Sequence, residues 1–313
     1  MERQLIITHH APDIDAIGAV WILKRFDMNK YADAKLAFVN PGETISMDAA
    51  NELGFQLYNT THVDTGLGRF DHHQPDKGMQ RLSATMLVHD YVVSKNLSLE
   101  KNEALDIIIE FITQIDHFEE IYWPDAGSYR YAFLIHELIR GIEFADPHND
   151  ESQMQFGLTC LDSAYAVLTQ QVKAKEIIAE KGREFTIDRS DDDKNVEIKC
   201  LALLTRNDDT LKIAQKQGFE LVIRKDQKLG NIRIKVRPDS KIHLKPLYKA
   251  ITAVDPKATW YYHPSGKMLL NGTKKHHNQI PSKLSVDEVI NLTKISLSNK
   301  TKNEKNKEQN DTK

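Results

Sequence analysis

Short apolar runs alternate with longer helical patterns in the first half of the chain. The run at residues 4–9 predicts a buried strand, the run at 35–40 a second strand, and residues 61–74 a short strand followed by a Gly-rich turn. Residues 15–26 carry apolar side chains at helical spacing, which predicts a helix whose apolar face covers a sheet. Strands that alternate with helices are typical of crossover connections, so the pattern predicts an α/β fold with a parallel sheet.

The pattern changes after a charged break at residues 188–195, which follows a stretch in which helices dominate. Strand-like segments and a helical segment at 244–254 come after the break, as is typical of a smaller α+β domain. The end of the chain is polar and predicts disorder. We therefore predict a first domain at 1–187, a linker at 188–195, a second domain at 196–294 and a disordered tail at 295–313.

The composition narrows the class of protein. The chain has 313 residues and a net charge of −3, so it has no overall basic field for nucleic acid or a membrane surface. No apolar stretch approaches the ~20 residues of a membrane span, and the first residues lack a signal-peptide pattern. Cys160 and Cys200 are far apart in the sequence, which is usual in a reducing compartment. We expect a cytoplasmic protein with no membrane partner and no Cys-based metal site.

Polar clusters rich in aspartate and histidine follow the apolar runs. They comprise His9, His10, Asp13 and Asp15, then Asp64, then Asp71, His72 and His73, with Asp116 as a fourth candidate. Because the carboxyl ends of neighbouring parallel strands meet, we expect these side chains to share one pocket. Carboxylates with imidazoles and no thiolate suit Mn²⁺, with Mg²⁺ or another divalent ion as an alternative. Two such ions about 4 Å apart activate a water and hold a phosphoryl oxygen.

Each cluster taken alone also has a simpler explanation. Asp13 and Asp15 stand at the start of a helical pattern, where aspartates commonly cap the helix. A lone "DHH" is usually part of a solvated loop. The joint spacing favours a site, because capping explains neither the histidine four positions before Asp13 nor the "DHH" after a strand.

The order and spacing of these clusters resemble the DHH phosphoesterase superfamily. The motifs are "HHAPDIDAIG", "VDTG" and "FDHHQ", followed by the helical "SATMLVHDYV". The superfamily includes RecJ-type exonucleases, oligoribonucleases, cyclic-dinucleotide phosphodiesterases and manganese-dependent inorganic pyrophosphatases. The resemblance implies a parallel-sheet DHH domain with flanking helices and two-metal hydrolysis of phosphate esters.

Residue by residue, the resemblance also implies roles in the site. The metal ligands would be His9 and Asp13 for one Mn²⁺ ion, Asp15 and His72 for the second, Asp64 between the two, and Asp116 from the fourth motif. His73 would face the substrate as a phosphate ligand or a proton donor to the leaving oxygen. Asp71 would orient a histidine. His10 is one residue out of register with His9, and it is the alternative to His9 as the metal ligand.

In this superfamily a smaller C-terminal domain closes over the cleft and contacts the substrate. Here "HPSGKMLLNGTK" resembles the melanocyte-proliferating-gene family, whose members are described as 3′–5′ RNA exonucleases. The substrate-binding candidates are His263, Ser265, Gly266 and Lys274 in this segment, and Arg237 beside an alternating basic strand. A hairpin turn at "PSG" and a solvent-facing strand are the simpler alternative.

We therefore expect a metal-dependent phosphoesterase that hydrolyses phosphodiester bonds of short RNA, DNA or nucleotides, with a 3′–5′ exonuclease as one form. The alternatives are an inorganic pyrophosphatase or polyphosphatase, a cyclic-dinucleotide hydrolase, and a catalytically silent metal-binding regulator. Every matched ligand position keeps a side chain that can bind metal, which favours an enzyme. The oligomeric state, a homodimer included, stays open.

Overall fold

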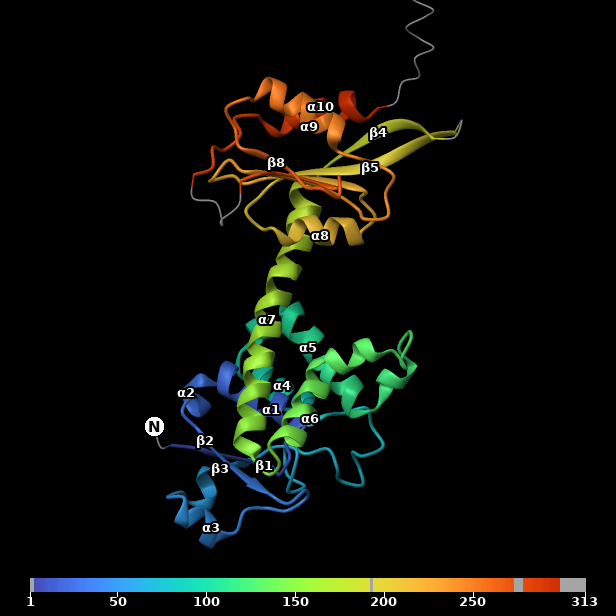
Figure 1. Ribbon diagram of the computed structural model, residues 1–313. Helices are drawn as coiled ribbons and strands as arrows, with labels where there is room; N and C mark the ends of the chain where they lie inside the picture. Colours follow the sequence, from blue (N-terminus) through green and yellow to red (C-terminus); the bar gives the residue numbers. More distant parts are fainter. Residues whose placement is uncertain (1–2, 192–193, 273–277, 299–313) are drawn as a thin grey trace, which may run out of the picture. The chain divides into compact units, whose positions relative to one another are not determined.

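The computed structural model describes residues 3–191, 194–272 and 278–298. The chain divides into two compact units, Met1–Thr169 and Gln170–Lys313. Each unit has its own sheet, with three strands in the first and six in the second (Figure 1). The predicted α/β class is confirmed, because the first sheet is parallel and the second unit mixes strands with helices.

The first sheet has the strand order β2-β1-β3. These strands are β1 (Leu5–His9), β2 (Lys35–Val39) and β3 (Thr60–His62). All pairs are parallel, and Ile7 of β1 lies opposite Ala37 and His62. The carboxyl ends of the three strands therefore lie at one edge of the sheet, where the loops that follow them meet.

Both faces of this sheet are covered, because successive side chains of β1 point to opposite sides. Leu5 and Ile7 pack beside α3, whereas Ile6 packs into the larger helical core. The helices of this unit are α1 (Ile14–Phe26), α2 (Met28–Tyr31), α3 (Met47–Glu52), α4 (Ala84–Lys95), α5 (Glu103–Asp116), α6 (Ile135–Ala145) and the first part of α7 (Asp150–Lys181). Short 3-10 turns lie at Leu57–Asn59, Leu97–Lys101, Glu119–Tyr122 and Tyr129–Phe133.

Helix α1 is the centre of the core, since every residue from Ile14 to Leu23 is buried. Two glycines allow other helices to approach it closely. A Cβ on Gly18 would lie 2.4 Å from the hydroxyl of Thr85 in α4, and a Cβ on Gly157 of α7 would lie 2.7 Å from Ile17. The residues that begin α1 are therefore held in a tightly packed frame.

The second unit is a six-stranded sheet with helices on both faces. Its strand order is β4-β5-β6-β7-β9-β8, with only β5 and β6 parallel. The elements are β4 (Arg183–Asp191), β5 (Lys194–Leu204), α8 (Asp209–Lys216), β6 (Leu221–Lys225), β7 (Ile232–Val236), α9 (Lys245–Val254), β8 (Trp260–Tyr262), β9 (Met268–Asn271) and α10 (Val286–Leu297). Helices α9 and α10 cover one face, while α8 and the last turns of α7 cover the other (Figure 1).

The structure places the boundaries differently from the sequence prediction. The two units divide after Thr169, within helix α7, and the segment 188–195 contributes paired residues to β4 and β5 instead of a linker. Polar composition did not distinguish the two cases, because the ends of paired strands can be as polar as a linker. The predicted tail also begins too early, since Ile295 and Leu297 belong to α10. Residues 299–313 lie outside the described residues.

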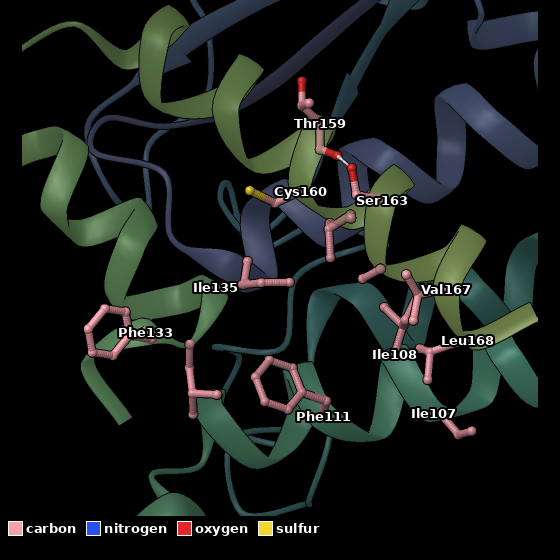
Figure 2. A pocket seen from close by; sticks show the side chains of 13 residues that line it. Ile107, Ile108, Phe111, Phe133, Ile135, Thr159, Cys160, Ser163, Val167 and Leu168 are labelled. Carbon is pink, nitrogen blue, oxygen red and sulfur yellow. Dashed lines mark hydrogen bonds between the residues drawn. The ribbon is translucent and has the colours of Figure 1, made fainter. Parts of the chain in front are cut away.

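A cavity of about 600 Å³ lies between α5, α6 and α7 of the first unit (Figure 2). Its wall is largely apolar and includes Phe111, Ile135 and Val167. Cys160 from α7 also lines it, and burial raises the pKa of this thiol. Among the described residues, no helix combines the length and apolar character that crossing a bilayer requires.

Candidate metal centre

The chain brings the polar clusters together at the carboxyl edge of the first sheet. His9 ends β1, and Asp64 follows β3 by two residues. The imidazole Nε2 of His9 lies 3.2 Å from Asp64 Oδ2. Asp64 has a left-handed backbone, with φ of 54°, and its amide donates to the carbonyl of Phe70. This turn joins the β3 end to the segment that carries His72.

Asp13 has two roles at the start of α1. Its Oδ1 caps the helix by accepting from the amides of Asp15 and Ala16, at 2.9 and 3.0 Å. Asp13 also offers a carboxylate oxygen within 4.8 Å of ligand atoms of His9 and Asp64. Capping and membership of the cluster are thus compatible, because a carboxylate has two oxygens.

Asp15 is buried and does not cap its own helix. Its Oδ2 accepts from the amide of Ala84 at 2.6 Å, and its Oδ1 accepts from Thr85 at 2.8 Å. It therefore satisfies the amino end of α4 and fixes α1 against α4. The same Oδ2 lies 3.6 Å from His72 Nε2, so Asp15 also borders the cluster.

His72 stands among three carboxylates. Its Nε2 lies 3.5 Å from Asp64 Oδ1, 3.6 Å from Asp15 Oδ2 and 3.6 Å from Asp116 Oδ2. These distances exceed a hydrogen bond, and the buried atoms His72 Nε2, Asp64 Oδ1 and Asp116 Oδ2 make none with any described residue. Buried polar atoms without partners are costly, and a ring nitrogen flanked by two such carboxylate oxygens fits a bound cation.

Asp116 reaches this point as the last residue of α5, and the next residue adds a further imidazole. His117 offers a ring nitrogen within 4.8 Å of ligand atoms of His72 and Asp116. Its Nε2 donates to the carbonyl of Leu82 at 2.9 Å, which fixes the ring. Sequence reasoning did not select His117; its place beside Asp116 at a helix end was the available signal.

His73 lies at the exposed side of the cluster. Its Nδ1 donates to Asp71 Oδ1 at 2.8 Å, and its amide donates to the same oxygen. Asp71 is fully buried and also accepts from the amide of Leu67, so it holds the loop and the ring together. The His73 side chain is 59% exposed, which leaves Nε2 available to a bound molecule.

The pKa values of the cluster indicate that its environment favours positive charge. Burial lowers the pKa of His9, but the hydrogen bond with Asp64 and the charge of Asp13 outweigh it and raise the pKa to about 9. Burial also lowers the pKa of His72, but Asp64 outweighs this effect and raises the pKa to about 9. Burial raises the pKa of Asp116 to about 6. Without a metal ion, protons on these side chains offset the negative charge of the carboxylates, which a bound cation would otherwise neutralise.

The pKa values of two buried aspartates move in opposite directions. Burial and the charge of Asp64 hold the pKa of Asp15 well above its usual range. Burial acts in the same way on Asp64, but the nearby rings of His72 and His9 outweigh it and lower the pKa of Asp64. Asp64 is thus the ionised centre, with Oδ2 toward His9 and Oδ1 toward His72. The mixed nitrogen and oxygen donors fit a divalent metal ion.

The structure distinguishes His9 from His10. His10 Nδ1 lies 2.6 Å from Asp150 Oδ2 at the start of α7, and its side chain is largely exposed. His9 instead faces Asp64 and lies in a group of ligand atoms with Asp13. Of the two histidines that the sequence left open, His9 is therefore the one in the cluster.

The substrate-binding candidates lie in the second unit. His263, Ser265 and Gly266 form the turn between β8 and β9, where His263 Nδ1 is 2.8 Å from Ser265 Oγ. Gly266 has φ of 70°, and a Cβ there would meet a neighbouring histidine at 2.7 Å, so the turn requires glycine. Arg237 follows β7 and its Nε donates to Asp239 at 3.0 Å. Lys274 lies outside the described residues.

No protein-family model matches the sequence, and no curated protein matches it. Among solved structures, the chain is similar to RecJ from Thermus thermophilus in complex with Mn²⁺, with 12% identity and a TM-score of 0.29. The similarity covers 87% of this chain and 50% of the RecJ chain, so this chain spans about half the length of that protein. The assignment of the site therefore depends on its own geometry.

Proposed function

We propose that the protein is a divalent-metal-dependent phosphoesterase that hydrolyses phosphodiester bonds of short nucleic acids or nucleotides. The observation that carries this proposal is that His72 Nε2 and the two carboxylate oxygens that flank it, Asp64 Oδ1 and Asp116 Oδ2, are buried and without partners among the described residues. A solvated loop or a set of helix caps does not require buried polar atoms without partners. The order of motifs that resembles the DHH phosphoesterases supports the same conclusion.

The residues fall into two groups that share Asp64. His9 and Asp13 would hold one Mn²⁺ ion, and Mg²⁺ is the alternative. Asp15, His72 and Asp116 would hold the second. When bound, such a pair lowers the pKa of an intervening water and neutralises charge on phosphoryl oxygens. Asp13 is exposed, so the site opens to solvent on the side of the first group.

The protein side chains supply orientation and a proton. Asp71 accepts from His73 Nδ1 and thereby directs Nε2 outward. With its outer nitrogen protonated, His73 donates to the leaving oxygen of the ester. Asp15 keeps α1 and α4 together, so that the residues of both segments hold their places during the reaction.

The second unit would contact the remainder of the substrate. The backbone amides around Gly266 and the side chains of His263 and Ser265 supply donors for phosphate. Arg237 and Lys274 would add charge. A short RNA cut from its 3′ end is the substrate that the C-terminal resemblance favours.

A panel of substrates tests the proposal. The purified protein with Mn²⁺ would receive bis-p-nitrophenyl phosphate, a labelled dinucleotide, a labelled 24-mer RNA, cyclic di-AMP and pyrophosphate. Asp64→Asn is the site control, and Asp90→Asn at an exposed position of α4 is the matched surface control. We expect phosphodiester cleavage that is lost in Asp64→Asn and kept in Asp90→Asn. Cleavage of pyrophosphate alone would favour a pyrophosphatase, and metal binding without any cleavage would favour a silent regulator.

A further inference from the structure

The loop that joins His9 to Asp13 is held by the first turn of α7, far away in the sequence. Asp150 uses both oxygens: Oδ2 lies 2.6 Å from His10 Nδ1, and Oδ1 accepts from the amide of Ala11 at 2.7 Å. Gln153, one turn further along α7 and buried, donates to the carbonyl of Pro12 at 3.1 Å. Each residue of the loop therefore has a partner on α7.

The loop needs this support because its backbone is strained. Ala11 has φ of 49°, in the left-handed region that costs a residue with a Cβ roughly 1–2 kcal/mol. Such a conformation persists only where the surroundings hold it. On its other side the loop is fixed by the amide of His10, which donates to the carbonyl of Val39 in β2 at 2.8 Å.

Helix α7 provides a fixed point for this contact. Met154 and Leu161 of α7 are buried in the core of the first unit. Gly157 of α7 lies so close to α1 that a Cβ there would be 2.7 Å from Ile17. The first turns of α7 are thus packed against the same helix α1 that Asp13 caps.

We propose that Asp150 is a positioning residue for the metal centre, an inference that rests on the proposed function. Asp150 acts through His10 and Ala11 to set the spacing of His9 and Asp13. Both of its oxygens are occupied by these contacts, so it is not itself a ligand. The family resemblance gave this residue no role, and 140 positions separate it from His10.

Binding of Mn²⁺ tests this role without any assay of activity. The variants are Asp150→Ala, Asp150→Asn and, as a matched control, Asp162→Ala. The control removes a carboxylate from the same helix, but one that contacts Trp21 and Arg25 away from the loop. The electron paramagnetic resonance signal of free Mn²⁺ gives the affinity, and thermal unfolding of the metal-free proteins gives the stability.

Partners that orient metal ligands typically contribute 10–100-fold to affinity. We expect Asp150→Ala to weaken Mn²⁺ binding by about that factor. Asp150→Asn keeps an acceptor for the Ala11 amide and should fall between Asp150→Ala and the wild type. Asp162→Ala should lower the unfolding temperature but leave the affinity within about twofold.

The outcomes separate this inference from the proposed function. Unchanged Mn²⁺ affinity in Asp150→Ala, with a wild type that binds Mn²⁺, overturns the role of Asp150 alone. An equal loss of affinity in Asp162→Ala also overturns it, because the effect would then follow from general stability. A wild type that binds no Mn²⁺ overturns the proposed function and this inference together.

Discussion

His72 Nε2 lies 3.5 Å from Asp64 Oδ1, and neither atom makes a hydrogen bond with another residue in the described part of the chain. The two atoms are close enough to share a metal ion but too far apart to bond each other. Asp64 directs its other oxygen toward His9. One carboxylate thus connects the two groups of candidate ligands.

Replacement of Asp64 should therefore remove metal binding. Asparagine keeps the shape and tolerates the left-handed backbone at this position, so Asp64→Asn removes the charge with little strain. We expect Mn²⁺ affinity to fall by at least about 100-fold and turnover to disappear with it. Titration calorimetry measures the affinity, and normal affinity in a folded Asp64→Asn protein would contradict the assignment. Asp64→Ala should lose both properties as well.

His73→Ala should separate metal binding from turnover. The side chain is exposed and bonded to Asp71, outside the group of unpartnered buried atoms. Loss of a proton donor typically costs 10²–10⁴-fold in rate. We expect turnover of the dinucleotide to fall by about that range, while Mn²⁺ affinity stays within about threefold. Normal turnover in this variant would exclude His73 as the proton donor.

Metal binding should release protons at neutral pH. The pKa values of His9 and His72 are about 9 in the metal-free protein, so both rings carry a proton at pH 7. A metal ion binds only the neutral ring, so binding of Mn²⁺ at both groups should release at least the two ring protons. Affinity should then rise as the pH increases from 7 and level off above about 9.

Calorimetry in buffers of different ionisation enthalpy counts these protons. Removal of one ring in His9→Asn should reduce the count by about one. A count near zero at pH 7 in the wild type would show that neither ring belongs to the metal centre.

Two glycine substitutions should change stability in opposite directions. In Gly18→Ala the new methyl group would lie 2.4 Å from the Thr85 hydroxyl, which bonds the carbonyl of Asp15. Overpacking of this kind costs about 1–3 kcal/mol in the free energy of unfolding. Gly141→Ala lies within helix α6 and meets no atom within 4 Å, so it should stabilise by about 1 kcal/mol. Urea unfolding measures both values, and a neutral Gly18→Ala would contradict the close approach of α1 and α4.

The first sheet was predictable because its signals are local. A buried parallel strand is a short apolar run, and β1 follows this rule in the printed sequence, while the partly buried β2 is also a short apolar run. The convergence of polar residues followed from topology, since neighbouring parallel strands place their carboxyl ends together. Asp13 showed where local reasoning is ambiguous, because the same carboxylate caps α1 and borders the cluster.

The remaining features depend on partners that no local pattern reveals. Asp15 binds the amides of α4, 69 and 70 positions further along the chain. The charged segment 188–195 was predicted as a linker, but its described residues end β4 and begin β5, and no local pattern reveals that these two strands pair. The sequence predicted no role for Asp150, because one carboxylate at the start of a helix is common and His10 is distant in the sequence.

The two cysteines have a practical consequence for experiments on this protein. Cys200 is fully buried in β5 and its pKa is raised to about 12 by burial, so its thiol is closed to reagents in the native state. Cys160 is only partly buried, at the wall of the apolar cavity (Figure 2). The natural chain thus carries one addressable thiol, and a polarity-sensitive dye attached there would report on the α5–α7 wall without any engineered cysteine.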